Sequence, residues 1–241
     1  MSGRVVVVVP AYRPAPSGHE TISLQRCGQL LGQQRLALAM PSGCTPHEYL
    51  KLAPGAAVEV FPDRYFDGVQ GYNSLLLSSE FYRRFSVFDY ILIAQLDTFI
   101  FSDELDEWVA RGFDYVGAPW WNQVDTLSLR VPLPFLRQPV RVGNGGLSLR
   151  RVRSCLWALR LFRQSALRWQ TNEDLFWSAF VPAWWPWFRI PDFETALGFA
   201  IETQPRRSVE LLGRLPFGCH AWSRYDLEFW RPHIEACGYS L

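Results

Sequence analysis

The chain has 241 residues, of which 49% are hydrophobic and 20% are charged, and its formal net charge of +1 argues against a dedicated nucleic-acid-binding protein. Its five cysteines are scattered and form no C-x-x-C pair, which excludes a disulfide framework and a structural zinc site and fits a reducing compartment. Without a recognisable signal peptide or an apolar run of membrane-spanning length, we expect a cytoplasmic protein.

Strands and helices alternate through the first part of the chain. RVVVVVPAYRP, residues 4–14, is a continuous β-branched run that ends in a proline-containing loop, as is typical of a central parallel strand. Apolar spacing predicts a helix over residues 19–31, followed by a strand in RLALAMP, a short helix in TPHEYLKLAP and a third strand in AAVEVFP. This order predicts βαβ units and a parallel sheet.

One carboxylate interrupts the apolar sequence YILIAQLDTFIF. Helical spacing over residues 73–85 precedes a fourth predicted strand at residues 90–94, and Asp97 follows the carboxyl end of that strand. Open α/β sheets bind ligands outside this edge. A charged group is costly to bury without a partner, so Asp97 either caps backbone N–H groups or binds a ligand.

The second part of the chain predicts further helices around a long loop. SDELDEWVARG predicts a helix, FDYVGAPWW a strand, residues 120–140 a functional loop, and VRVGNGGLSLRR a glycine turn followed by a strand. Helices are predicted in SCLWALRLFRQSALRW, TNEDLFWSAF and PDFETALGFAIE, before a loop and a last helix. The pattern predicts one α/β domain with a Rossmann-like, mostly parallel sheet flanked by helices.

Three segments besides Asp97 carry candidate chemistry. In VGNGG, glycines around Asn144 permit positive φ and close approach to a ligand, although a tight turn accounts for the same pattern. Glu173 and Asp174 begin a helix, where the dipole favours acids, and a carboxylate there can also act as a general base. His220, in PFGCHAW, is either a packed histidine or a metal ligand.

In this order, the acid, the glycines, the acid pair and the histidine resemble the nucleotide-sugar glycosyltransferases of the GT-A fold, which carry a D-x-D motif, a glycine loop, an x-E-D motif and a C-terminal histidine. YNSLLLSSEFY, YILIAQLDTFIF, GNGGLSLR and PFGCHAW further resemble a bacterial family of glycosyltransferase-like proteins whose reactions are mostly unassigned. The resemblance covers essentially the whole chain. It implies a nucleotide-binding half of about 1–101 and an acceptor-side half of about 102–241.

The resemblance implies a divalent cation, Mn²⁺ or Mg²⁺, held by Asp97 and His220 and bridging the diphosphate of a nucleotide-sugar donor. Gln95 stands where D-x-D has its first acid, so it would hydrogen bond a ribose hydroxyl without adding negative charge. Metal affinity would then be weak, and metal independence stays open. The residues that would hold the nucleoside and the donor or acceptor sugar are Pro10, Ala11, Tyr12, Arg13, Asn144, Gly145 and Gly146.

The same resemblance implies that Asp174 deprotonates an acceptor hydroxyl, with Glu173 as its support or as the acceptor's anchor. Such a base implies inversion at the sugar, while a retaining reaction stays open. The expected acceptor is a glycan or lipid-linked glycan of bacterial surface glycan synthesis, and the arginine-rich segment 150–168 is either a solvated face or a peripheral membrane contact. Tryptophans at positions 120, 121, 184, 185 and 187 are candidates for an acceptor cleft.

Two other classes of function remain. A nucleotidyltransferase that makes sugar nucleotides shares the α/β layout, but AYRPAPSG lacks the glycine-rich loop that such enzymes carry after the first strand. A non-catalytic carbohydrate-binding module would use the tryptophans but would not need the strand-end Asp97 or the acid pair.

Overall fold

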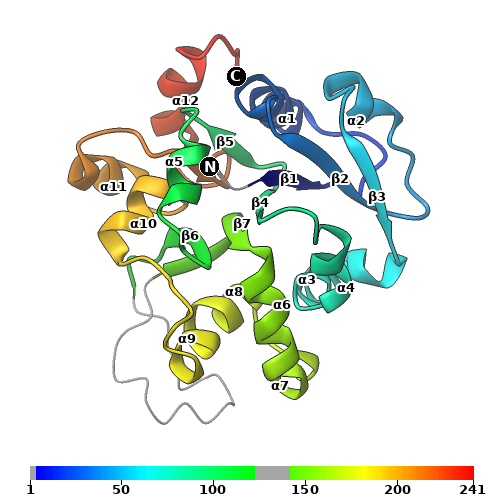
Figure 1. Cartoon of the computed structure of the whole chain (residues 1–241). Coiled ribbons are helices and arrows are strands. Elements are labelled where there is room, and N and C mark those ends of the chain that lie inside the picture. Colours follow the sequence, from blue (N-terminus) through cyan, green and yellow to red (C-terminus); the bar gives the residue numbers. More distant parts are fainter. Residues whose placement is uncertain (1–3, 123–141) are drawn as a thin grey trace.

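A computed structural model describes residues 4–122 and 142–241 (Figure 1). Its central layer is a six-stranded sheet in the order β3-β2-β1-β4-β7-β6. β1 pairs in parallel with β2 and β4, and β2 pairs in parallel with β3. The strands of this sheet are β1 (Val5–Pro10), β2 (Arg35–Pro41), β3 (Ala57–Phe61), β4 (Tyr90–Ala94), β6 (Tyr115–Pro119) and β7 (Val142–Arg151).

Strand β7 departs from the parallel pattern, because it pairs antiparallel with both β4 and β6. The segment that the sequence predicts as a turn followed by a strand is one ten-residue strand that runs through the glycines. Of these glycines only Gly143 has a positive φ, +143°. The glycine segment is therefore extended backbone, and its amino-terminal end lies at the edge of the sheet where β4 ends.

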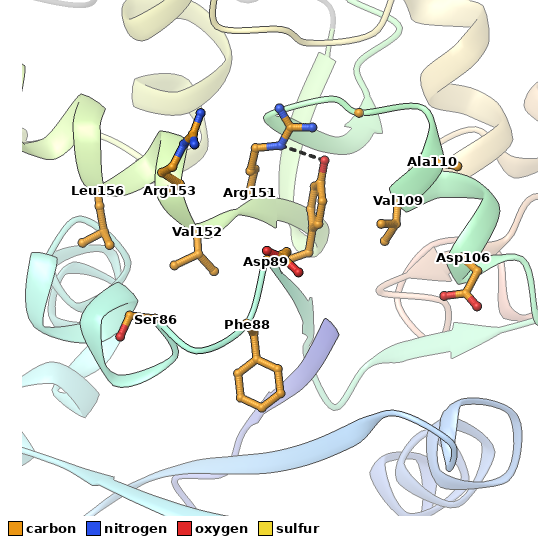
Figure 2. A pocket seen from close by; sticks show the side chains of 12 residues that line it. Ser86, Phe88, Asp89, Asp106, Val109, Ala110, Arg151, Val152, Arg153 and Leu156 are labelled. Atoms are coloured by element: carbon orange, nitrogen blue, oxygen red, sulfur yellow. Dashed lines mark hydrogen bonds between the residues drawn. The ribbon is translucent and has the colours of Figure 1, made fainter. Parts of the chain in front are cut away.

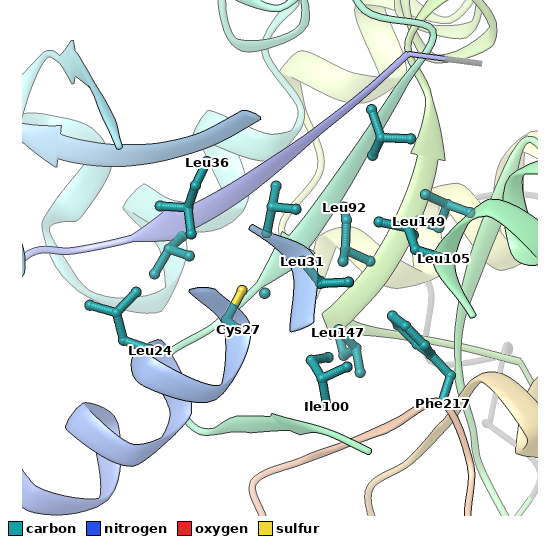
Figure 3. Close-up of a cluster of buried hydrophobic side chains, with 14 of the residues drawn as sticks. Leu24, Cys27, Leu31, Leu36, Leu92, Ile100, Leu105, Leu147, Leu149 and Phe217 are labelled. Atoms are coloured by element: carbon teal, nitrogen blue, oxygen red, sulfur yellow. The ribbon is translucent and has the colours of Figure 1, made fainter. Parts of the chain in front are cut away.

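The alternating side chains of β1 divide the core into two layers. Val5, Val7 and Val9 face a cluster that includes α1 (Gly18–Leu31), α2 (His47–Leu52) and α5 (Leu105–Ala110). Figure 3 shows Leu24 and Cys27 of α1 in this cluster, together with Leu92, Leu147 and Leu149 of the central sheet. Five consecutive valines suit this position, because a central strand is buried on both faces.

Val6 and Val8 face the second cluster, which contains the helices on the other side of the sheet. The predicted helix 73–85 is two helices, because Ser78 leaves the helical backbone and its hydroxyl accepts a hydrogen bond from the N–H of Phe81. The predicted arginine-rich helix likewise breaks at Phe162. The elements of this layer are α3 (Gly68–Leu76), α4 (Ser79–Arg84), α6 (Val152–Leu161), α7 (Arg163–Leu167), α8 (Glu173–Leu175), the π-helical turn η3 (Phe176–Phe180) and α9 (Val181–Trp184).

A small second sheet in the order β5-β9-β8 packs against the C-terminal helix and carries part of PFGCHAW, which the sequence predicted as loop. No helix in the described ranges has the length and apolarity that crossing a bilayer requires. The remaining elements are η1 (Asp63–Phe66), β5 (Thr98–Ile100), α10 (Phe193–Phe199), β8 (Ala200–Ile201), α11 (Pro205–Leu212), β9 (Gly218–His220) and α12 (Leu227–Glu235).

Candidate active site

A cavity of about 630 Å³ opens at the carboxyl ends of β1 and β4, beside the glycine segment of β7. Ala11 does not line it, because this residue is buried and its N–H continues the pairing of β1 by donating to Ala39 O at 2.9 Å. The sequence-predicted site residues that do line it are Pro10, Tyr12, Arg13, Gln95, Asp97, Asn144, Gly145, Gly146, Glu173, Asp174 and His220.

The antiparallel pairing of β7 brings two predicted motifs together. Ala94 is opposite Leu147, and one residue further the N–H of Gln95 donates to Gly146 O at 2.9 Å. The sequence LDTF then turns into β5, which pairs antiparallel with β9, and Thr98 lies opposite His220. Segments more than 120 residues apart therefore meet at one edge of the sheet.

Asp97 has a partner, and it is His220. His220 Nε2 lies 3.2 Å from Asp97 Oδ1 and 3.2 Å from Gln95 Oε1, and Nδ1 lies 3.2 Å from Glu202 Oε1. Burial by itself lowers the pKa of His220, but the two carboxylates outweigh it and raise the pKa to about 9. Burial likewise raises the pKa of Asp97, but the hydrogen bond and charge of His220 outweigh it and hold the pKa below its ordinary value.

The contact between Nδ1 of His220 and Glu202 is close but does not have hydrogen-bond geometry, so the imidazole is oriented mainly through its Nε2 contacts. Nε2 is the nitrogen turned toward Asp97 and Gln95, while the Glu202 carboxylate lies against Nδ1. A carboxylate behind one ring nitrogen is the usual setting of a metal-ligating histidine. Nevertheless, the described ranges contain no group of three or more His, Cys, Asp or Glu side chains arranged around a cation position.

The imidazole of His220 occupies the space that a side chain at position 146 would need. A β-carbon at Gly146 would overlap the imidazole ring, and one at Gly145 would overlap Oε1 of Glu173. The two glycines of the predicted loop are therefore required by packing against site residues. Because these two glycines lack side chains, Glu173 and His220 can approach the backbone of β7.

Glu173 forms an ion pair with Arg150, a residue that the sequence analysis did not single out. Arg150 donates to both carboxylate oxygens of Glu173, at 2.8 and 2.9 Å, and its guanidinium also donates to Ser148 Oγ and Tyr82 Oη. Both partners are almost completely buried. Since both oxygens of Glu173 accept hydrogen bonds from Arg150, we expect this carboxylate to act as support or as an anchor of the acceptor rather than to take a proton.

Asp174 is different. It lies in the first turn of α8 and lines the cavity, and its buried Oδ1 has no hydrogen-bond partner among the described residues. Burial, together with the charge of Glu173, raises the pKa of Asp174 to about 8. A carboxyl group that gains and loses a proton near neutral pH is suited to general acid or base chemistry.

The loop after β1 forms another wall of the cavity. Tyr12 is half-exposed, and the Arg13 guanidinium lies 5.6 Å from the centre of its ring and 3.4 Å from Glu20 Oε1. Ser17 and Glu20 hold the start of α1 in a capping box, which the S-x-x-E spacing could have revealed. An exposed aromatic ring and an arginine at a strand end suit a nucleoside and its phosphates.

Other lining residues were not predicted as site residues, and among them are Glu20, Tyr72, Asn73 and Arg224, although Tyr72 and Asn73 begin the motif YNSLLLSSEFY. Glu202 does not line the cavity, but it contacts His220 and accepts a hydrogen bond from Asn144 Nδ2 at 2.9 Å. Its position directly after the apolar run GFAI is the same signal that identified Asp97, so the sequence could have revealed it.

The five tryptophans proposed for an acceptor cleft do not line this cavity, and of the predicted loop 120–140 only its first three residues lie within the described ranges. A second hollow of about 800 Å³ lies at the opposite edge of the sheet, where β4 begins. Figure 2 shows Arg153 and Leu156 along one of its sides and Val109 and Ala110 along the other. None of the sequence-predicted site residues lines this second hollow.

Comparison with known proteins gives the family and the fold. Residues 55–220, more than half of the chain, match the family described as "Protein of unknown function (DUF5672)", so the chain belongs to that family. No curated protein matches the chain.

Solved structures similar to this chain include glycosyltransferases. The galactosyltransferase LgtC, in complex with donor and acceptor sugar analogs, superimposes with a TM-score of 0.54 at 9% identity, covering 96% of this chain and 95% of LgtC. An active-site mutant of LgtC gives a TM-score of 0.57 at 10% identity over the same shares. The bifunctional glycosyltransferase WbbM gives 0.56 at 10% identity over 91% of this chain, which spans 46% of WbbM. The fold is therefore that of the GT-A glycosyltransferases.

Proposed function

We propose that this member of the DUF5672 family transfers a sugar from a nucleotide-diphosphate sugar to a hydroxyl group of an acceptor. The observation that carries the proposal is that Asp97, His220 and Gln95, which contact one another, line the same cavity as Asp174. The Oδ1 atom of Asp174 is buried and has no partner among the described residues. The similarity to LgtC, a galactosyltransferase solved with donor and acceptor sugar analogs, supports a donor and an acceptor sharing one cleft.

The donor's diphosphate is proposed to lie against Asp97 and His220 with Mn²⁺ or Mg²⁺. A carboxylate oxygen, an imidazole nitrogen and the amide oxygen of Gln95 are donor types that Mn²⁺ accepts. Because Asp97 is the only carboxylate in this set, the ion would be held weakly without phosphate oxygens. When bound, a cation offsets the negative charge that develops on the departing nucleoside diphosphate.

Asp174 is proposed as the general base of an inverting reaction. Its carboxylate takes the proton of the acceptor hydroxyl, the hydroxyl oxygen bonds to the anomeric carbon, and the bond from that carbon to the diphosphate breaks. The nucleoside diphosphate leaves with the bonding electron pair. A pKa of about 8 makes the ionised carboxylate a stronger base than an ordinary aspartate.

The wider role is proposed as bacterial surface glycan synthesis on the cytoplasmic side, with a glycan or lipid-linked glycan as acceptor. The test is release of nucleoside diphosphate from a panel of nucleotide-sugars, with and without Mn²⁺, beside the Asp97→Asn variant. A nucleotidyltransferase would instead consume a sugar phosphate and a nucleoside triphosphate and release pyrophosphate, and a binding module would release nothing.

A further inference from the structure

The surface formed by α6 and α7 carries exposed arginines and no exposed acid. Between residues 142 and 191 the only acids are Glu173 and Asp174, and both are buried in the site described above. Exposed arginines and apolar residues of α6 and α7, and the residue directly after α7, make up what we name the basic face. Its residues are Arg153, Trp157, Arg160, Leu161, Arg163, Leu167 and Arg168.

The residues of the basic face on α6 have the spacing of an amphipathic helix. On α6 the exposed positions 153, 157, 160 and 161 alternate with Val152, Cys155, Ala158 and Leu159, which are buried in the core. The exposed set mixes arginine with large apolar side chains, since Trp157 is 54%, Leu161 64% and Leu167 70% exposed. Exposed apolar side chains one turn apart, as Trp157 and Leu161 are on α6, suit contact with an apolar phase better than contact with water alone.

No arginine of the basic face forms an ion pair within the described residues, although Arg153 lines the second hollow together with Asp89 and Asp106. Within the described residues, the side chains of Arg153, Arg163 and Arg168 form no ion pair or hydrogen bond. The guanidinium of Arg160 lies 5.3 Å from the centre of the Trp157 ring and therefore stays on the surface beside it. A solvated helix normally gains stability from acid–base pairs three or four residues apart, and the sequence of α6 and α7 contains no acid to form one.

We propose that the basic face docks on the surface of an anionic lipid bilayer. Arginines meet lipid phosphates, and tryptophan and leucine side chains enter the boundary between headgroups and acyl chains. A second copy of the chain fits less well, because a two-fold contact would set arginines against arginines with no acid on either face. A nucleic acid would meet the arginines but would leave Leu161 and Leu167 without an apolar environment.

The basic face is followed in the chain by a segment at the cavity rim. Docking therefore has a consequence for catalysis, which rests on the proposed function. Asn172, which lines the cavity, follows Arg168 by four residues. The intervening segment is joined to α3 at the cavity rim, since Gln70 Nε2 donates to Gln170 O at 3.3 Å. A docked protein would therefore hold this part of the rim near the lipid headgroups, where a lipid-linked acceptor is carried.

The test is flotation of the protein with vesicles of phosphatidylcholine alone or mixed with phosphatidylglycerol, without any sugar. Wild type should bind the mixed vesicles, more weakly as salt rises, and should not bind phosphatidylcholine. The triple variant Arg160→Gln, Arg163→Gln, Arg168→Gln should bind roughly 100-fold more weakly, since each arginine near an anionic surface contributes about five-fold. Trp157→Ser with Leu161→Ser should weaken binding at every salt concentration.

The matched control is Arg35→Gln, Arg207→Gln, Arg214→Gln, which removes the same charge from β2, from α11 and from the segment after it and should bind like wild type. Equal losses in the two triple variants, or no binding of wild type to the mixed vesicles, would overturn the proposal. So would a dimer in analytical ultracentrifugation that the face variants abolish. Because no sugar is present, these outcomes are independent of whether the chain transfers one.

Discussion

Arg150 and Glu173 form an ion pair with two parallel hydrogen bonds in the interior of the protein, with the guanidinium 5.2 Å from the centre of the Tyr115 ring. The pair joins the middle of the central sheet to the start of the helix that carries Asp174. A buried guanidinium and a buried carboxylate have each lost their hydration, so removing either one leaves the other as an uncompensated buried charge. The position of Asp174 at the cavity therefore depends on Arg150.

Removing one member of this pair should destabilise the protein more than removing both. Arg150→Met leaves the Glu173 carboxylate buried without a partner and should lower the free energy of unfolding by about 3–5 kcal/mol. The double variant Arg150→Met, Glu173→Leu should recover a large part of that loss. Urea unfolding of both variants and wild type measures the effect, and a double variant no more stable than Arg150→Met would contradict it.

Asp174→Asn should lower sugar transfer by about 10²–10⁴-fold, the usual contribution of a general base, because asparagine keeps the shape and loses the basicity. Donor affinity should stay at the wild-type value, since the base acts on the acceptor. In wild type, kcat/KM should rise with pH through about 8, where the carboxyl ionises. Turnover assays and donor titration check this once a substrate pair is known. An Asp174→Asn variant with near wild-type turnover would contradict this role and leave a retaining reaction that does not use Asp174 as a base.

The same residue should make stability depend on pH. The folded-state pKa of Asp174 is raised to about 8, so between the unfolded value near 4 and pH 8 the unfolded chain loses this proton first, and rising pH destabilises wild type. Asp174→Asn lacks that ionisation. Its stability relative to wild type should increase by about 1.4 kcal/mol per pH unit across this window. The measurement is urea unfolding of both proteins between pH 5 and 8. A constant difference between their free energies of unfolding over this range would contradict a raised pKa of Asp174.

Gly146→Ala should disturb His220 directly. The added β-carbon overlaps the imidazole ring, so the ring must leave Asp97, and Mn²⁺-dependent binding of nucleoside diphosphate should fall by an order of magnitude or more. Gly55→Ala is the control, because a β-carbon there meets no atom within 4 Å. Calorimetric titration of both variants separates a local effect at His220 from the general cost of replacing a glycine.

Mn²⁺ should strengthen nucleoside-diphosphate binding through Asp97 and His220. Asp97→Asn should remove most of that enhancement, and His220→Ala a smaller part, because the carboxylate contributes the negative charge. The measurement is calorimetry with Mn²⁺ and with a chelator. Identical affinity in the two conditions would show that the site binds diphosphate without a cation, and would leave the fold assignment untouched.

The strands of the first half were predictable because their signals are local. Five valines, RLALAMP and YILIA are short apolar runs bounded by turn residues, and each forms a strand of the central sheet where the sequence predicts it. The position of Asp97 at the ligand-binding edge followed from the same rule. The direction of β7 was not predictable, because pairing direction depends on partners far along the chain.

The partners inside the site were the part that sequence reasoning missed. Arg150 is one of two neighbouring arginines in GLSLRR, and only the pleat of β7 decides that its side chain points to Glu173 while that of Arg151 contacts Tyr90. The glycine pattern predicted close approach of a ligand. The structure instead shows close approach of His220 and Glu173, which sequence separation conceals.

The place of β7 between β4 and β6 also has a consequence for how the protein is made. Strand β4 pairs with β1 on one side and with β7 on the other, and β6 is not its neighbour. Since synthesis proceeds from the N-terminus, we expect the second edge of β4 to stay unpaired until residues 142–151 have been made. An open strand edge on a nascent chain is a template for aggregation. The strand that carries the site's glycines also pairs with the free edge of β4. A substitution that weakens β7 should therefore lower the yield of folded protein before it alters catalysis.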